Sequence, residues 1–142
     1  MQRSSITLLG LMAAVVLAGC AKGAKSTVAQ ASGSSMAAQG SNVFLVNCAS
    51  CHQADGEGVP GTFPPLAGNA VVGGDPVKVI HIVKYGLTGS VVVAGKTFNG
   101  MMPAWSSQLS DADIAAAITY VRSSWGNHAT PVTADQVSAV SK

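Results

Sequence analysis

The stretch NCASCHQADGEG, residues 47–58, places two thiols and an imidazole within five consecutive positions, at Cys48, Cys51 and His52. The whole chain of 142 residues contains only three Cys and three His. At that composition, a C-x-x-C-H match arises by chance roughly once in a thousand sequences. The cluster therefore indicates a chemical role for these three side chains.

Three kinds of chemistry suit these residues: a Cys48–Cys51 disulfide, half of a zinc site, or two thioether bonds to a haem whose iron binds His52. A structural zinc ion needs four ligands. No cysteine follows Cys51, and His81 and His128 stand alone in the sequence. A disulfide suits an exported protein but gives the imidazole no role. Covalent haem accounts for both thiols and the imidazole together.

Residues 1–19 have the features of a lipoprotein-type signal peptide. Arg3 precedes an apolar run at residues 6–18, which is shorter than the roughly 18 residues expected of a membrane-spanning helix. The sequence Leu17-Ala18-Gly19-Cys20 resembles the bacterial lipobox. We therefore expect lipid on Cys20 and an exported protein anchored to a bacterial membrane, facing the periplasm. The alternative is an ordinary signal peptide with a cysteine at the cleavage site.

The remaining chain divides into three parts. Residues 20–36, rich in Ser, Gly and Ala, predict a lipidated flexible tether. Residues 37–128 suffice for one small domain, whose lean core usually needs a disulfide, a metal or a cofactor to complete it. Residues 129–142 form a C-terminal tail, which either covers this domain or hangs free. Without Arg3, seven Lys/Arg oppose six Asp/Glu, and this near-neutral balance argues against a nucleic-acid partner.

The sequence predicts three main helices. The first spans residues 36–48 and ends in the C-x-x-C-H stretch. The second is capped by Asp75, with Pro76 at its first position and Gly86 near its end. The third begins at the capping box of Ser110 and is expected to stop at Gly126. The apolar faces expected of the second and third helices are Val77, Ile80, Val83 and Leu87, and Ile114, Ala117, Ile118, Val121 and Trp125.

Two irregular regions separate these helices. Residues 53–75 are rich in Gly and Pro and predict a long loop, which in a small domain usually wraps around something. Residues 91–100 predict a short hairpin that turns at Ala94-Gly95-Lys96.

A second ligand for a haem iron is offered by Met101 and Met102, in a segment that Gly100 and Pro103 keep out of regular structure. Methionine on haem iron raises the reduction potential, as in an electron carrier. Two alternatives remain: both methionines fill core gaps, or His81 on the second helix takes the position.

Together these segments resemble the class I c-type cytochromes, and most of all the small bacterial monohaem cytochromes. The resemblance covers about residues 37–130. Its motifs are Gly40-x-x-x-Phe44-x-x-x-Cys48-x-x-Cys51-His52, Gly56-x-Gly58, Phe63-Pro64-Pro65-Leu66-Ala67-Gly68, Gly100-x-Met102-Pro103-Ala104, Leu109-Ser110-Asp111, and Ala117-x-x-Tyr120-Val121-Arg122-x-x-Trp125-Gly126-Asn127.

The resemblance implies a mainly α fold, the cytochrome c fold, with three main helices, loops and a short hairpin wrapped around one covalent haem c. It makes Cys48 and Cys51 the thioether sites and His52 the proximal ligand. Met102 becomes the distal ligand, because the family's methionine directly precedes a proline. The family's proline carbonyl that accepts the imidazole hydrogen bond corresponds to Pro64.

The resemblance also leaves points open. Pro65 is the alternative to Pro64 as that acceptor. The family packs its first helix on its last through small and aromatic residues, which correspond to Gly40 and Phe44 against Ala117 and Tyr120. Tyr85 and Trp105 either contact the haem propionates or only pack.

By this resemblance the protein is expected to carry single electrons between membrane-associated respiratory proteins, through iron bound by His52 and Met102. No enzymatic activity and no small-molecule substrate are expected, because both axial positions are filled. One alternative is a fixed cytochrome subunit of a membrane dehydrogenase or terminal oxidase. Another is a haem-based ligand sensor in which the methionine is displaced.

Overall fold

The computed structural model describes residues 26–142, and for residues 26–34 it describes the backbone alone. The predicted signal peptide at residues 1–19 and the predicted lipid site, Cys20, lie outside the described residues. Within the part of the chain that is described, no helix combines the length and the apolar character needed to cross a bilayer.

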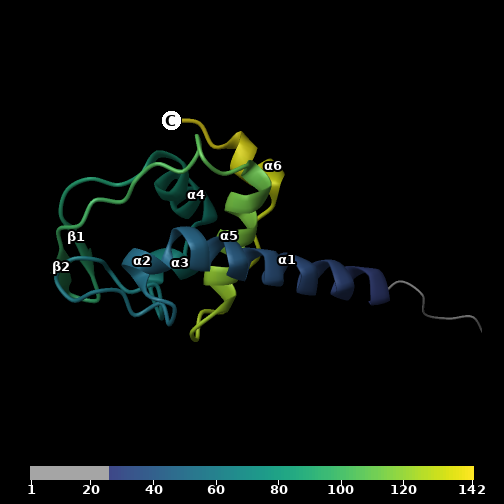
Figure 1. The fold of residues 1–142 in the computed structure, drawn as a ribbon, viewed down its shortest axis with the longest axis horizontal. Helices are drawn as coiled ribbons and strands as arrows, with labels where there is room; N and C mark the ends of the chain where they lie inside the picture. The colour runs from purple at the N-terminus through teal and green to yellow at the C-terminus, as the bar shows by residue number, and fades with distance from the viewer. Residues whose placement is uncertain (1–25) are drawn as a thin grey trace, which may run out of the picture.

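Two helices far apart in the sequence, α1 (Ser26–Asn47) and α5 (Asp111–Ser123), cross at the centre of the molecule (Figure 1). The crossing is close because Gly40 has no side chain. A Cβ atom there would lie 2.1 Å from the carbonyl oxygen of Ala116 and 2.8 Å from Cβ of Tyr120. The predicted packing of Gly40 on the third main helix, now α5, is confirmed, but Gly40 contacts Ala116 rather than Ala117. Ala116 and Tyr120 are four residues apart and so share one ridge of α5.

Phe44 is fully buried beneath an aromatic cluster. Its ring centroid lies 5.6 Å from that of Tyr120 and 5.0 Å from that of Trp125, and the Tyr120 and Trp125 rings meet edge to face at 5.4 Å. Tilted and edge-to-face pairs stabilise a core by about 0.5–1.5 kcal/mol beyond their buried area. Cys48 packs against this cluster, so the aromatic rings support the start of the C-x-x-C-H stretch.

The first helix begins at Ser26, not at residue 36, and therefore enters the range predicted as a flexible tether. No proline interrupts residues 26–47. Each residue added to an existing helix gains a hydrogen bond without repeating the cost of nucleation. The part of α1 that packs on α5 therefore acts as a nucleus, and the helix continues from it toward the N-terminus.

The helix α5 begins as predicted, because the Ser110 hydroxyl oxygen accepts the Asp113 N–H at 3.1 Å. It ends at Ser123, earlier than the predicted stop at Gly126. The Ser124 hydroxyl donates to a carbonyl of the last turn at 2.7 Å, and such side-chain bonds compete with helix continuation. Trp125 then adopts a φ of 51°, so it reaches the aromatic cluster from a turn and not from the helix face.

The helix α4 (Pro76–Tyr85) has the predicted ends. The Asp75 side chain accepts the N–H of Val77 at 2.9 Å, and Gly86 follows the helix with a φ of 81°. A φ in this left-handed region is readily adopted only by glycine.

The buried face of α4 differs from the prediction. Val79, Ile80 and Lys84 are buried, whereas Val77 is 54% exposed. The helix packs against both α5 and the C-terminal α6 (Ala134–Ala139), which rotates the buried face away from Val77. The main core cluster consists of Val79, Ile80, Ile114, Ala115, Ile118, Val132 and Val137.

The predicted hairpin is present as β1 (Val91–Val93) and β2 (Lys96–Phe98), at the end of the molecule opposite the start of α1 (Figure 1). Ala94 and Gly95 form its turn, both with positive φ, as two-residue hairpin turns require. Lys96 pairs with Val93 and belongs to the strand, so the turn is one residue shorter than predicted.

The predicted loop at residues 53–75 contains a short helix, α3 (Ala70–Gly73), that the sequence analysis missed. The Asn69 side chain accepts the N–H of Val71 at 2.8 Å and caps it. Val72 is buried in a second core cluster, with Phe44 and Val121, and this burial stabilises a helix too short to form alone.

The C-terminal tail covers the domain, which answers a question that the sequence left open. Thr133 caps α6, while Val132 and Val137 are fully buried in the main core cluster. The core therefore extends past the predicted domain boundary at residue 128. The mainly helical architecture with one short hairpin is confirmed.

Candidate functional site

The two cysteines lie at a single helical turn, α2 (Ala49–His52), which follows α1 after a break at Cys48. The Cys48 N–H donates to the carbonyl of Phe44 at 2.8 Å, and the N–H groups of Cys51 and His52 donate to the Cys48 carbonyl at 3.1 and 3.0 Å. Residues three apart on such a turn share a face. Both thiols are free and half-buried, and they are therefore presented together.

Burial, and to a smaller extent the neighbouring Cys51, raises the pKa of Cys48 to about 11. Cys48 is therefore a neutral thiol near pH 7. Among residues 26–142, no three His, Cys, Asp or Glu side chains are grouped so that they could hold a metal ion.

His52 is only 8% exposed, and its Nδ1 atom lies 3.0 Å from the carbonyl oxygen of Pro64. Because a carbonyl can only accept, Nδ1 donates and Nε2 carries the lone pair of the neutral ring. Burial lowers the pKa of His52, and the hydrogen bond to Pro64 opposes this only in part. A neutral imidazole oriented through one nitrogen can bind iron through the other.

The predicted contact between His52 and Pro64 is thus present, and the alternative acceptor, Pro65, has another partner. The Pro65 carbonyl accepts from the Asn69 amide at 2.7 Å. The next carbonyl along the chain, that of Leu66, accepts from the Asn127 amide at 2.9 Å. These two buried side chains fix the segment that carries Pro64.

Sequence reasoning missed these roles of Asn69 and Asn127. The only signal for Asn69 was its position before three apolar residues, as in a helix cap. Nothing around Asn127 indicates that its amide spans from Leu66 to the Val121 carbonyl, at 2.9 Å from each.

Gly58 brings the chain back to the backbone of His52. Its N–H donates to the His52 carbonyl at 2.9 Å. A Cβ atom at Gly58 would lie 2.4 Å from the Phe63 carbonyl oxygen and 2.7 Å from that of Pro64. Its φ of 66° also lies in the left-handed region. Glycine is therefore required for this close approach.

The backbone of Met102 is fixed just beyond the end of α4. The N–H of Met102 donates to the Leu87 carbonyl at 2.9 Å, and the Leu87 N–H donates back to Met102 at 3.0 Å. Met102 is half-buried, whereas Met101 is 69% exposed. Met102 is thus the less exposed of the two methionines.

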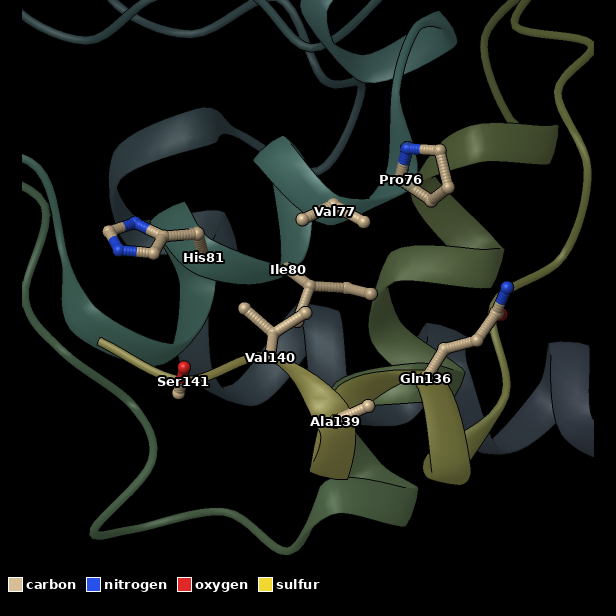
Figure 2. Close-up of a pocket in the computed structure, with 8 residues that line it drawn as sticks. All are labelled: Pro76, Val77, Ile80, His81, Gln136, Ala139, Val140 and Ser141. Atoms are coloured by element: carbon tan, nitrogen blue, oxygen red, sulfur yellow. The ribbon is translucent and has the colours of Figure 1, made fainter.

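His81, the other candidate for the second axial position, is exposed and packs on the Tyr85 ring at 5.0 Å. It lies at the edge of a hollow of about 400 Å³ between α4 and α6. Figure 2 shows its ring pointing outward, while Ile80 and Val140 face each other at the centre. None of the predicted haem-binding residues lines this hollow, which lies between α4 and the C-terminal tail.

The donors fit a haem held covalently. Two free thiols have the C-x-x-C spacing that thioether bonds to two vinyl groups require. The adjacent imidazole is neutral and oriented. Methionine sulfur suits haem iron opposite histidine, and Met102 offers one from a fixed backbone.

The comparisons with known proteins agree with this chemistry. The family model described as Cytochrome c matches residues 37–125. Cytochrome c-552 of Thermus thermophilus is 38% identical over 122 residues, which are 82% of this chain and 72% of that protein.

Two further relatives are longer proteins. The cytochrome c subunit of the alcohol dehydrogenase (quinone) of Gluconobacter oxydans is 40% identical over 92 residues, 63% of this chain and 19% of that subunit. The subunit CcoP of the Cbb3-type cytochrome c oxidase of Cereibacter sphaeroides is 33% identical over 88 residues, 61% of this chain and 27% of that subunit. With the donor set described above, these matches show that the chain belongs to the cytochrome c family and carries covalently bound haem c for electron transfer.

Proposed function

We propose that this cytochrome is a lipid-anchored carrier that moves single electrons between membrane-associated respiratory proteins. Cys48 and Cys51 form the thioether bonds, and His52 and Met102 bind the iron. The observation that carries this assignment is the hydrogen bond from His52 to Pro64, because it orients Nε2 as a ligand. When bound, the haem supplies a one-electron couple.

The protein residues in this proposal hold and tune the couple. The Pro64 carbonyl increases the basicity of the imidazole. The sulfur of Met102 favours the reduced state and raises the potential. With both axial positions filled by protein, no position remains for a substrate, and we therefore propose electron transfer without catalysis.

The partner class is supported by the relatives. Their names include cytochrome subunits of an alcohol dehydrogenase, a gluconate 2-dehydrogenase and a terminal oxidase. These names favour respiratory redox proteins as the donors and acceptors of this chain.

A fixed subunit of such an enzyme is the second candidate. The matched residues are 72% of cytochrome c-552 and 19% of the Gluconobacter subunit. Purification from native membranes under mild detergent separates the two: a carrier elutes alone, and a fixed subunit elutes with its enzyme.

Anchoring through Cys20 rests on the lipobox-like sequence before it. Two or more acyl chains hold a protein on a membrane stably, whereas one does not. The Cys20→Ser variant is expected to move from the membrane fraction to the soluble fraction, with its haem spectrum unchanged. If that variant stays on the membrane, the proposed lipid anchor is wrong, but the haem-site assignment is unaffected.

The site assignment is tested by visible spectroscopy of the purified protein. Haem that stays with the chain through acid-acetone extraction, and is lost from Cys48→Ala/Cys51→Ala, establishes the thioether bonds. The weak sulfur-to-iron charge-transfer band of the oxidised protein should disappear in Met102→Ala and persist in Met101→Ala, the matched control. Haem that extracts freely, or a band that depends on Met101, would overturn the assignment.

A further inference from the structure

The last turn of α4 is held between two segments of the chain. On one side lies the segment that carries Met102, whose backbone pairs with Leu87. The following N–H groups, of Trp105 and Ser106, donate to the carbonyls of Val83 and Lys84 at 3.1 and 3.2 Å. The methionine segment is therefore registered by main-chain bonds to the end of this helix.

On the other side lies the C-terminal tail. The Lys84 ammonium donates to the carbonyls of Val137 and Val140 at 2.7 and 2.8 Å. The Tyr85 hydroxyl donates to the same Val140 carbonyl at 2.9 Å. The hydroxyl of Tyr85 is thus engaged by the tail. Lys84 joins both sides, since its carbonyl meets the methionine segment and its ammonium meets the tail.

These tail contacts place strong constraints on Lys84. The residue is only 8% exposed. Both hydrogen bonds of its ammonium group go to carbonyls at the C-terminal end of α6. The carbonyls at a helix C-terminus carry partial negative charge. A buried ammonium that loses such partners is costly, or it has to move to water. Either outcome would displace the last turn of α4.

The tail is also held by α5, so its position does not depend on α4 alone. The Thr119 hydroxyl donates to the Val132 carbonyl at 3.2 Å and accepts the Val132 N–H at 3.0 Å. Arg122 donates to the Thr130 carbonyl at 2.9 Å. These bonds join the tail to α5. The family match ends at residue 125, before all of the tail residues involved.

We propose that Lys84 and Tyr85 are positioning residues through which the C-terminal tail holds Met102 in place as an axial ligand. The tail fixes the last turn of α4, and that turn fixes the backbone of Met102. This inference rests on the proposed role of Met102. It assigns to the tail a part in controlling how easily the methionine leaves the iron.

The test adds imidazole to the oxidised holoprotein, where it displaces the methionine from the iron. Loss of the sulfur-to-iron band reports this displacement. The variants are Lys84→Met, which keeps the length of the side chain, and Tyr85→Phe, which removes one hydroxyl. We expect imidazole to bind about tenfold more tightly to Lys84→Met, and severalfold more tightly to Tyr85→Phe, because charged hydrogen bonds contribute more than neutral ones.

Two controls separate positioning from general stability. Lys78→Met makes the same substitution at an exposed position of α4, and it should leave imidazole affinity within twofold of the wild type. Asp113→Asn removes a carboxylate that the Ser110 hydroxyl and the Gln39 amide bond at the start of α5, away from the tail and the haem-binding residues. It lowers the free energy of unfolding but should not change imidazole affinity.

The outcomes are distinguishable from failure of the site assignment. If the wild type shows the band and Lys84→Met binds imidazole like Lys78→Met or Asp113→Asn, the positioning role of Lys84 is wrong, while the assignment of Met102 as a ligand stands. If the wild type lacks the band, the ligand assignment fails first, and with it the inference.

Discussion

The imidazole of His52 donates its Nδ1 hydrogen to the carbonyl oxygen of Pro64 across 3.0 Å. The same carbonyl lies against Gly58, where a Cβ atom would approach its oxygen to 2.7 Å. One glycine therefore controls the geometry of a hydrogen bond that it does not make, and this allows the bond to be tested without altering either partner.

Gly58→Ala should raise the reduction potential by about 40 mV. The added methyl displaces the Pro64 carbonyl and weakens the hydrogen bond that makes the imidazole more basic. A more basic ligand stabilises the oxidised iron, so weakening it favours the reduced state. The size follows from a hydrogen bond of ~1 kcal/mol, which corresponds to about 40 mV for one electron. Redox titration of the variant and the wild type measures this shift in potential.

Gly61→Ala is the control for this experiment. Gly61 lies in the same loop with a φ of 74°, but no atom lies within 4 Å of a Cβ placed there. It has the same backbone strain as Gly58 without the contact. Equal shifts in the two variants would attribute the effect to the loop and remove the role of the Pro64 carbonyl.

Gly40→Ala should lower the free energy of unfolding by about 3 kcal/mol or more, because a Cβ atom at 2.1 Å from the Ala116 oxygen forces α1 away from α5. Gly73→Ala is the matched control, since Gly73 is also helical and nothing lies within 4 Å of its Cβ position. Urea denaturation of both variants measures the difference. A loss at Gly40 no larger than at Gly73 would mean that the crossing adjusts freely.

Arg122→Lys should cost about 2–4 kcal/mol of stability. Arg122 is 2% exposed, and its guanidinium donates to the carbonyls of Val72, Gly74 and Thr130 at 2.6, 3.0 and 2.9 Å. A lysine has one nitrogen and cannot reach all three, so buried carbonyls lose their partner.

The control for Arg122 is Thr130→Val, which removes only the long 3.5 Å contact of the guanidinium with the Thr130 hydroxyl. It should change stability by less than about 0.5 kcal/mol. Thermal unfolding of both holoproteins decides the matter, and a tolerated lysine would show that water replaces the guanidinium.

The contribution of Asp113 to stability should disappear in acid. The Ser110 hydroxyl, followed by the Gln39 amide, lowers the pKa of Asp113. A carboxyl whose folded pKa is lowered stabilises the fold above its unfolded pKa, near 4, and loses this effect as the pH falls through the folded value.

Asp113→Asn should therefore be less stable than the wild type at pH 7, by less than about 1 kcal/mol because the site is open to water. The difference should vanish in acid, once the pH has fallen below the lowered pKa of the folded state. Asp111→Asn, which removes one negative charge from the same helical turn, is the matched control at pH 7. A difference that persists unchanged in acid would show that the effect does not come from the charge.

The sequence predicted the elements whose ends carry strong local signals. Asp75 with Pro76, Gly86 and Ser110 each satisfy or release backbone groups at a helix end, and each lies where expected. The hairpin followed from its strand pattern and Gly95. The contact of His52 with Pro64 was expected from the family resemblance and not from the pattern itself.

The sequence did not predict features that depend on tertiary contacts. The helix α3 needs burial of Val72, and the buried face of α4 depends on where the tail packs. Trp125 leaves the helix face because of the turn after Ser124. No local pattern marks such arrangements, because the partners are distant in sequence.

The position of Val132 and Val137 also has a consequence for the order in which the protein is made. Both belong to the last eleven residues and complete the main core. The C-x-x-C-H stretch is synthesised some eighty residues earlier. A chain that emerges from its N-terminus therefore presents its cysteines before the core can close. Vectorial synthesis thus provides an interval in which Cys48, one of the two proposed thioether sites, is still accessible for attachment of the cofactor.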